Sequence, residues 1–245
     1  MIVYPLSEGQ FTVDQTKVFV PFDASLHELN QRPTGSLLVE IQPFVVITSS
    51  DVILLDAGLG YRVGEELQIY RQLNAVGIRP EQITKVILSH LHKDHMGGIA
   101  YEDATGQWQA SFPQATYYVQ KSELDYALSM TSTSYLPSLL HWLLSYEKLM
   151  LLDGATTIGT TIRCEPSGGH CPFHQAVWIS ENGQIVFYGG DEAPQLQQMK
   201  HRFVAKYDKD GKKAMQLRAQ WWQQAETEQW TFLFYHDVTN AVYRR

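Results

Sequence analysis

Residues 89–98 read Ser-His-Leu-His-Lys-Asp-His-Met-Gly-Gly, and our expectations for the fold and the chemistry of the chain begin from these residues. Imidazole is the commonest metal-binding side chain in proteins, and three imidazoles and one carboxylate fall within six residues here. If the backbone enters the stretch still extended, His90 and His92 point to the same side and both reach one ion. Asp94 and His95 then lie on the following turn, where they face a neighbouring position.

A polar surface loop with idle histidines is the alternative to a metal site. Solvated loops rarely concentrate this side chain so densely, which makes the metal site the better interpretation. Gly97 and Gly98 also fit it, because a backbone without side chains can bend tightly around a cluster of ligands.

Apolar runs and helical spacing on either side of this stretch predict a mixed α/β chain. A hairpin is predicted for the runs at 44–48 and 52–55, and a second for the runs at 176–179 and 184–188, where Asn182 and Gly183 make a good turn. The remaining expected strands cover residues 85–88, 116–119, 158–164 and 230–234. Helices are expected at 63–76, 121–128 and 215–228, and a loop and a helix within 129–152.

Polar residues follow several of these predicted strands at the point where each strand ends. They are Asp56, His90, Asp191 and His236, while His170 follows another strand by a short loop. In layered α/β folds such ends share one rim, where loops converge above a rigid sheet. Scattered structural histidines would not favour one rim, so we expect these side chains to meet.

The composition favours one globular domain covering residues 1–245. The chain is 44% hydrophobic and contains no internal repeat or long linker. Residues 1–40 form an extended-looking N-terminal extension that could serve as the arm of a homodimer. Cys164 and Cys171 are too few for a disulfide framework and are expected to be free thiols.

Charge and hydropathy narrow the expected partners and compartment. Acidic residues outnumber basic ones by 26 to 19, which disfavours nucleic acid and anionic membranes and favours a small-molecule substrate. No apolar run approaches the roughly 20 residues of a membrane helix, and Met1–Pro5 does not begin a secretory signal, so a cytoplasmic protein is expected. The lysines within residues 206–213 alternate with aspartates and predict a solvated turn rather than a phosphate-binding patch.

Taken in order, these motifs resemble the metallo-β-lactamase superfamily. The pattern His90-x-His92-x-Asp94-His95 is preceded by residues 54–58, Leu-Leu-Asp-Ala-Gly, and followed by residues 169–174, Gly-His-Cys-Pro-Phe-His. Gly190-Asp191 and His236 complete the match, which extends over most of the chain. The resemblance implies an α/β fold, a four-layer αββα sandwich with its site at one edge of the two sheets.

The resemblance also implies a binuclear centre. One ion would be held by His90, His92 and His170, the other by Asp94, His95 and His236, and Asp191 would bridge the two. Asp56 would orient the ligands and His174 would support the site from beside it. Zinc is the family's usual metal, although histidine and carboxylate ligands also suit manganese, iron and nickel.

By the same resemblance the chain is a metal-dependent hydrolase. A hydroxide bound to the metals would attack a small ester, lactone or phosphoester, and no serine or cysteine nucleophile is needed. Asp94 would be catalytic as well as a ligand, because its place within the cluster lets it orient the hydroxide or shuttle a proton.

Residues 90–98 are most similar to the acyl-homoserine lactonase branch, with two departures. Cys171 and Phe173 replace a usual threonine and glycine, and we interpret Cys171 as a buried thiol rather than a soft ligand. Those lactonases also carry a tyrosine shortly after the bridging aspartate, whereas residues 192–194 here are Glu-Ala-Pro. The aromatic residues Tyr135, Trp142 and Tyr146 could line an apolar pocket or belong to the core.

Two other functions remain open from the sequence. A mononuclear iron enzyme similar to persulfide dioxygenases is an oxidoreductase on the same fold, and oxygen consumption with a persulfide would identify it. A non-catalytic metal-binding module is the second, but such proteins generally lose ligands, and the full set is present here.

Overall fold

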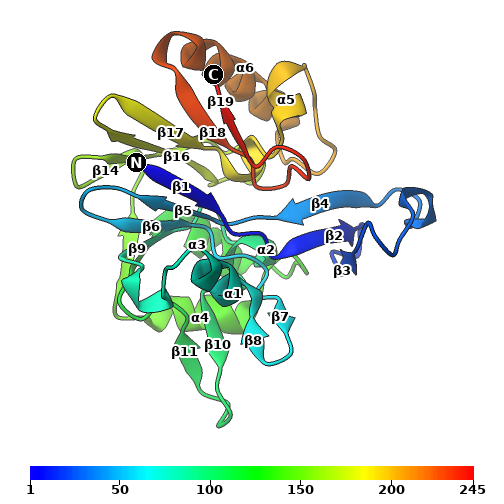
Figure 1. The fold of residues 1–245 in the computed structure, drawn as a ribbon, viewed down its shortest axis with the longest axis vertical. Helices are drawn as coiled ribbons and strands as arrows, with labels where there is room; N and C mark the ends of the chain where they lie inside the picture. The colour runs from blue at the N-terminus through cyan, green and yellow to red at the C-terminus, as the bar shows by residue number, and fades with distance from the viewer.

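Two six-stranded sheets pack face to face in the computed structural model, which describes residues 1–245 (Figure 1). In the order in which they pair, the strands of the first sheet are β1 (Ile2–Pro5), β5 (Phe44–Ile47), β6 (Val52–Leu55), β9 (Lys85–Ile87), β12 (Thr116–Gln120) and β13 (Leu149–Leu152). Those of the second sheet are β14 (Thr156–Ile158), β15 (Ile162–Pro166), β16 (Gln175–Glu181), β17 (Gln184–Tyr188), β18 (Trp230–Leu233) and β19 (Val242–Arg244).

Helices cover the outer surface of each sheet. The first sheet packs against α1 (Gln68–Ala75), α3 (Lys121–Ser129) and α4 (Pro137–Ser145), and the second against α5 (Leu196–Lys200) and α6 (Gly211–Glu228). The four-layer αββα sandwich expected from the sequence is therefore confirmed.

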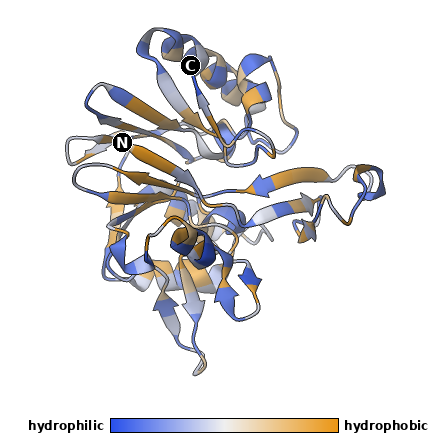
Figure 2. Cartoon of the chain, viewed as in Figure 1, coloured by the Kyte–Doolittle hydropathy of each residue, from blue (hydrophilic) through white to orange (hydrophobic).

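Alternation along the central strands explains the layers, because successive side chains of a strand point to opposite faces. In β6, Ile53 and Leu55 enter the core between the two sheets, while Leu54 enters the core beneath the helices. In β16, Val177 faces the first sheet and Trp178 faces α6. Figure 2 shows the corresponding apolar colour along many of the strands. These strands are buried on both faces, which is why their sequences are continuous apolar runs.

Most expected elements are present, including both hairpins, but three expectations were wrong in part. Residues 62–67 form a small hairpin, β7 (Arg62–Val63) and β8 (Glu66–Leu67), and the helix begins only at Gln68, because Gly64 turns the chain at a φ of 66°. Gly159, at a φ of 61°, divides the expected strand 158–164 into β14 and β15. The segment 129–152 ends in β13, a strand that was not expected.

A third sheet projects from the sandwich (Figure 1). It contains β2 (Gly9–Val13), β3 (Phe19–Phe22) and β4 (Leu37–Ile41), whereas β1 pairs with β5 in the first sheet. Beyond β3, Leu26 and Leu29 are exposed. The homodimer arm stays a prediction.

No helix of the structure combines the length and the hydropathy needed to cross a bilayer.

Candidate metal centre

The seven predicted ligands meet at one edge of the two sheets. His90 follows β9, Asp191 follows β17 and His236 follows β18. Asp94 and His95 belong to the short helix α2 (Lys93–Met96), which begins directly after His92, while His170 lies in the loop between β15 and β16. Strand ends of both sheets therefore supply the site, as the sequence predicted.

The first group of donor atoms is formed by His90, His92, His170 and Asp191. His92 Nδ1 lies 2.9 Å from His90 Nε2 and 3.1 Å from His170 Nε2. Asp191 Oδ2 lies 3.2 Å from His170 Nε2. Donors bound tetrahedrally to zinc at ordinary bond lengths are about 3.3 Å apart, so this spacing suits one ion.

The second group is formed by Asp94, His95 and His236. The other oxygen of Asp191, Oδ1, lies 3.1 Å from His95 Nε2 and 3.0 Å from His236 Nε2. Asp94 Oδ2 lies 3.5 Å from His236 Nε2. Asp191 thus presents one carboxylate oxygen to each group, which is the arrangement that a bridging ligand needs.

Two buried atoms, one of the second group and one of Asp191, have no hydrogen-bond partner. His95 Nε2 and Asp191 Oδ1 lie close together, but neither makes a hydrogen bond. Leaving such atoms unsatisfied in a buried place is costly. A cation between them would satisfy both, so the residues present fit a divalent metal ion.

Hydrogen bonds on the opposite ring nitrogen fix the orientation of four imidazoles. The acceptors for the Nδ1–H groups of His90, His95, His170 and His236 are Ser89 Oγ (3.0 Å), Asp56 Oδ2 (2.7 Å), Asp208 Oδ1 (3.0 Å) and the Glu40 carbonyl (2.7 Å). Each bond leaves the lone pair of Nε2 free for a metal, which is the usual arrangement around metal-binding histidines.

Asp56 is the centre of this support, as expected. Besides His95 it accepts hydrogen bonds from Tyr188 and from both the amide and the hydroxyl of Ser89. The residue is fully buried and holds a φ of 54°, in the left-handed region that is unfavourable for most side chains. Local strain at this position is therefore compensated by four hydrogen bonds on one carboxylate.

Electrostatics keep His90 and Asp191 in metal-binding protonation states, whereas the negative charge of Asp191 outweighs burial and raises the pKa of the imidazoles of His95, His170 and His236. Burial, together with the neighbouring His95 and His92, lowers the pKa of His90 well below its ordinary value. Burial alone would raise the pKa of Asp191, but the surrounding imidazoles hold it well below its ordinary value. A neutral imidazole and an ionised carboxylate are the forms that bind cations.

Three residues match the structural roles predicted for them. Cys171 belongs to neither donor group, and its buried thiol donates to Glu123 Oε2 at 3.4 Å. His174 is buried, and its Nδ1 lies 2.8 Å from Ser167 Oγ. Cys164 is also a free, buried thiol.

The three aromatic residues whose role was open divide between site and core. The Tyr135 ring lies 5.1 Å from the His92 ring and forms part of the wall of the site. Trp142 and Tyr146 stack on each other and pack in the core beneath the first sheet. Only one of the three therefore lies beside the donor groups.

Two residues beside the site were missed in the sequence. Asp208 and Tyr207 belong to the stretch expected to be a solvated turn, and its four lysines are indeed exposed. The Asp208 side chain, however, is only 1% exposed and lies beside His170. The Tyr207 ring lies 6.0 Å from the His170 ring. Alternating lysines and aspartates gave no sign that one carboxylate would turn inward.

Glu192 is a third missed residue and fixes the loop that carries His170. Its Oε2 accepts from the amides of His170 (3.0 Å) and Gly169 (3.2 Å) and from Ser167 Oγ (3.0 Å). The side chain is fully buried. Its place directly after Asp191 was the available signal, since one short turn can then position both carboxylates.

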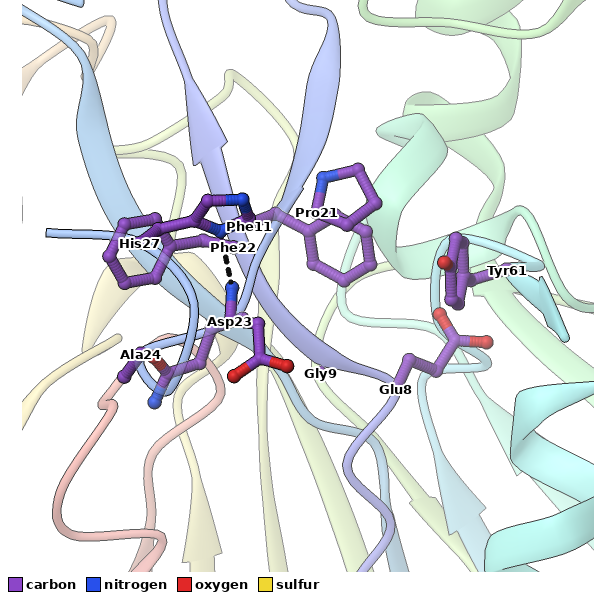
Figure 3. Close-up of a pocket in the computed structure, with 10 residues that line it drawn as sticks. Glu8, Gly9, Phe11, Pro21, Phe22, Asp23, Ala24, His27 and Tyr61 are labelled. Atoms are coloured by element: carbon purple, nitrogen blue, oxygen red, sulfur yellow. Dashed lines mark hydrogen bonds between the residues drawn. The ribbon is translucent and has the colours of Figure 1, made fainter. Parts of the chain in front are cut away.

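A separate pocket of about 410 Å³ lies between the projecting sheet and the loop that follows Asp56 (Figure 3). None of the seven predicted ligands lines it. On one side, the Glu8 carboxylate lies beside Tyr61 and accepts from the Leu59 amide at 2.6 Å. Burial raises the pKa of Glu8 to about 8. Glu8 thus ties the projecting sheet to this loop.

Comparisons with known proteins agree with this geometry. The family model of the metallo-beta-lactamase superfamily matches residues 39–198. An N-acyl homoserine lactonase of Bacillus sp. is 29% identical over 118 residues, which are 48% of this chain and 41% of that protein. The chain thus matches less than half the length of this curated relative.

Two solved structures share the fold. A probable metal-dependent hydrolase from Staphylococcus aureus superposes with a TM-score of 0.77 at 22% identity, covering 99% of this chain and 91% of that one. AidC, a dizinc quorum-quenching lactonase, superposes with a TM-score of 0.73 at 21% identity, covering 98% and 88%. At this identity the likeness establishes the architecture.

Proposed function

Because the chain belongs to the metallo-beta-lactamase superfamily, we propose that it is a hydrolase whose catalytic centre holds two divalent metal ions. The observation that carries the proposal is the position of Asp191, which turns one oxygen toward each of two groups of donor atoms. A site for a single ion would not need the second group.

The proposed ligands follow the two groups. His90, His92 and His170 hold one ion, Asp94, His95 and His236 hold the other, and Asp191 bridges them. Zinc is the proposed metal, because borderline imidazole ligands and carboxylates suit it and because one structural neighbour is named as a dizinc lactonase.

Two metal ions would supply a water that ionises near neutral pH and a Lewis acid for the carbonyl or phosphoryl oxygen of the substrate. Asp94 is the proposed proton acceptor and donor. Its carboxylate belongs to the second donor group, and its side chain is still 12% exposed to solvent. Its backbone carbonyl accepts from the Tyr235 hydroxyl, which fixes α2 against the segment that follows β18.

Tyr207 is the proposed substrate-positioning phenol. Its ring packs against His170, and its hydroxyl lies 3.2 Å from Gln198 Nε2. Desolvation of the hydroxyl raises the pKa of Tyr207 to about 12, so the phenol keeps its proton and can donate to a substrate oxygen. Residues 192–194 include no tyrosine, and Tyr207 brings one to the site from a later segment.

The proposed substrate is a small lactone, with other esters and phosphoesters as alternatives. The name of the Bacillus sp. relative supports a lactone. Phe173, three residues after His170, and Tyr207, whose ring lies 6.0 Å from the His170 ring, are both partly exposed and offer apolar surface to an uncharged substrate. Lactone hydrolysis requires no charged recognition group, which agrees with the chain's net charge of -7.

Elemental analysis combined with a substrate screen tests the proposal. The protein, purified without chelators, would be assayed on lactones, chromogenic esters and phosphoesters, before and after metal removal and zinc addition. We expect hydrolysis of at least one lactone, lost with the metal and restored by zinc. Hydrolysis that survives metal removal, or oxygen consumption with a persulfide by an iron-containing sample, would contradict it.

A further inference from the structure

Glu123 is a buried carboxylate that the proposed chemistry does not use. It lies in the first turn of α3, its side chain is fully buried, and it belongs to neither donor group. Placing an acid in such surroundings is costly unless hydrogen bonds compensate. Its contacts therefore indicate what the acid does.

Both oxygens of Glu123 accept hydrogen bonds, and they come from two different segments of the site. Oε1 accepts from the amide of Leu91 at 3.1 Å, and Leu91 stands between His90 and His92. Oε2 accepts from the thiol of Cys171 at 3.4 Å, and Cys171 directly follows His170. One carboxylate thus contacts both segments that carry the three imidazoles of the first donor group, one through a backbone amide and the other through a side-chain thiol.

We propose that Glu123 and Cys171 form a clamp that sets the separation of these two segments and thereby the affinity for the ion held by His90, His92 and His170. This inference rests on the proposed function. The separation matters because His92 and His170 are 78 residues apart in sequence, yet their donor nitrogens lie 3.1 Å from each other. A shift of a few tenths of an ångström would move one nitrogen out of bonding distance.

The other hydrogen bonds between these two segments lie on the chain before His90, while the amide of Lys93, after His92, donates to the Ser134 carbonyl of a third segment. Gln175 donates from its amide to the Ser89 carbonyl at 2.8 Å and from its side chain to the Leu88 carbonyl at 2.7 Å. These bonds fix the chain before His90. Leu91 comes directly after His90, and the amide of Leu91 donates to the Glu123 carboxylate.

The clamp also explains why a cysteine can stand where the family usually has a threonine. The position needs a small side chain with a hydrogen to donate, because Glu123 Oε2 is the acceptor in this contact. A thiol and a hydroxyl both meet this need. An alanine does not, and it leaves Oε2 buried without a partner.

The test compares zinc binding by four proteins: wild type, Cys171→Ala, Cys171→Ser and Cys164→Ala. Cys164 is the matched control, since it is the other buried thiol and packs between the two sheets without a hydrogen bond to any ligand segment. Zinc per chain is measured across a series of buffered free-zinc concentrations. The melting temperature of each zinc-free protein is recorded alongside.

We expect Cys171→Ala to bind one of its two ions about 10- to 100-fold more weakly, the range found when support for a metal ligand is removed. Cys171→Ser should stay within about threefold of wild type, and Cys164→Ala should lose thermal stability without losing zinc affinity. If Cys171→Ala does not fold, Glu123→Gln takes its place; it leaves one acceptor for two donors and should weaken the same ion.

Two results would overturn the clamp while the proposed function stands. One is a Cys171→Ala or Glu123→Gln protein that binds both ions as wild type does. The other is a Cys164→Ala protein that loses zinc affinity as strongly as Cys171→Ala, which would make the effect a general loss of packing. A wild type that binds no zinc would instead reject the proposed function itself.

Discussion

Asp208 Oδ1 accepts a hydrogen bond from His170 Nδ1–H at 3.0 Å, across 38 residues of sequence. The bond links the irregular segment between α5 and α6 to the first donor group. It fixes the ring so that Nε2 faces His92 and Asp191.

Removing this acceptor should weaken metal binding. We expect Asp208→Ala to reduce zinc affinity about 10- to 100-fold, because the His170 ring loses its orientation. Asp208→Asn keeps a carbonyl oxygen and should retain most of the affinity. Both variants can be compared by zinc titration against a chelator of known affinity, and equal affinities for Asp208→Ala and wild type would contradict the assigned role.

Asp94→Ala should lose more activity than a substitution of any residue that only orients a metal ligand. The variant lacks a proposed ligand and the proposed proton carrier, so we expect kcat to fall about 10²- to 10⁴-fold and zinc content to fall toward one ion per chain. Kinetics on the best substrate and elemental analysis of the same sample measure both effects. Full activity at full metal content would remove Asp94 from the mechanism.

Tyr207→Phe separates substrate positioning from metal binding. The variant keeps the ring against His170 and removes only the hydroxyl, so zinc content and melting temperature should stay unchanged. We expect kcat/KM to fall about tenfold, as for the loss of one hydrogen bond to a reacting group. Tyr146→Phe, which alters a tyrosine of the core beneath the first sheet, is the control. Equal kcat/KM values for Tyr207→Phe and wild type would count against the role.

Glu8 should make stability depend on pH. Its pKa in the folded protein, about 8, lies above the ordinary value of 4.5, so between these values the unfolded chain is ionised while the folded chain holds the proton. The contribution of protonated Glu8 to the free energy of unfolding is complete below pH 4.5 and is lost as the pH rises to 8. The free energy of unfolding then falls by at most about 1.4 kcal/mol per pH unit.

Glu8→Gln carries no titrating proton at this position. Its free energy of unfolding should therefore rise relative to that of wild type as the pH increases from 5 to 8. Denaturant titrations at several pH values measure the difference, and Glu102→Gln, which alters an exposed glutamate, should show no trend. A constant difference between Glu8→Gln and wild type over this range would show that Glu8 is ionised throughout.

The four layers and the set of seven ligands could be predicted because the ordered motifs from Asp56 to His236 resemble those of the metallo-β-lactamase superfamily. Apolar runs also locate the strands that Asp56, His90, Asp191 and His236 follow, and these strands run parallel in pairs, so their ends share an edge. The contacts of Asp208 and Glu123 could not be predicted, since each depends on how a distant segment packs against His170 or Leu91. The hairpin at Gly64 was missed because apolar residues at helical spacing continue through it.

Asp191 is proposed to join two ions, and the metal content of the protein and of its Asp191→Ala variant, measured by elemental analysis, tests this role. Wild type prepared without chelators should contain two divalent ions per chain, and the variant should contain one or none. A wild type without metal, or an Asp191→Ala protein that keeps both ions, would contradict the account.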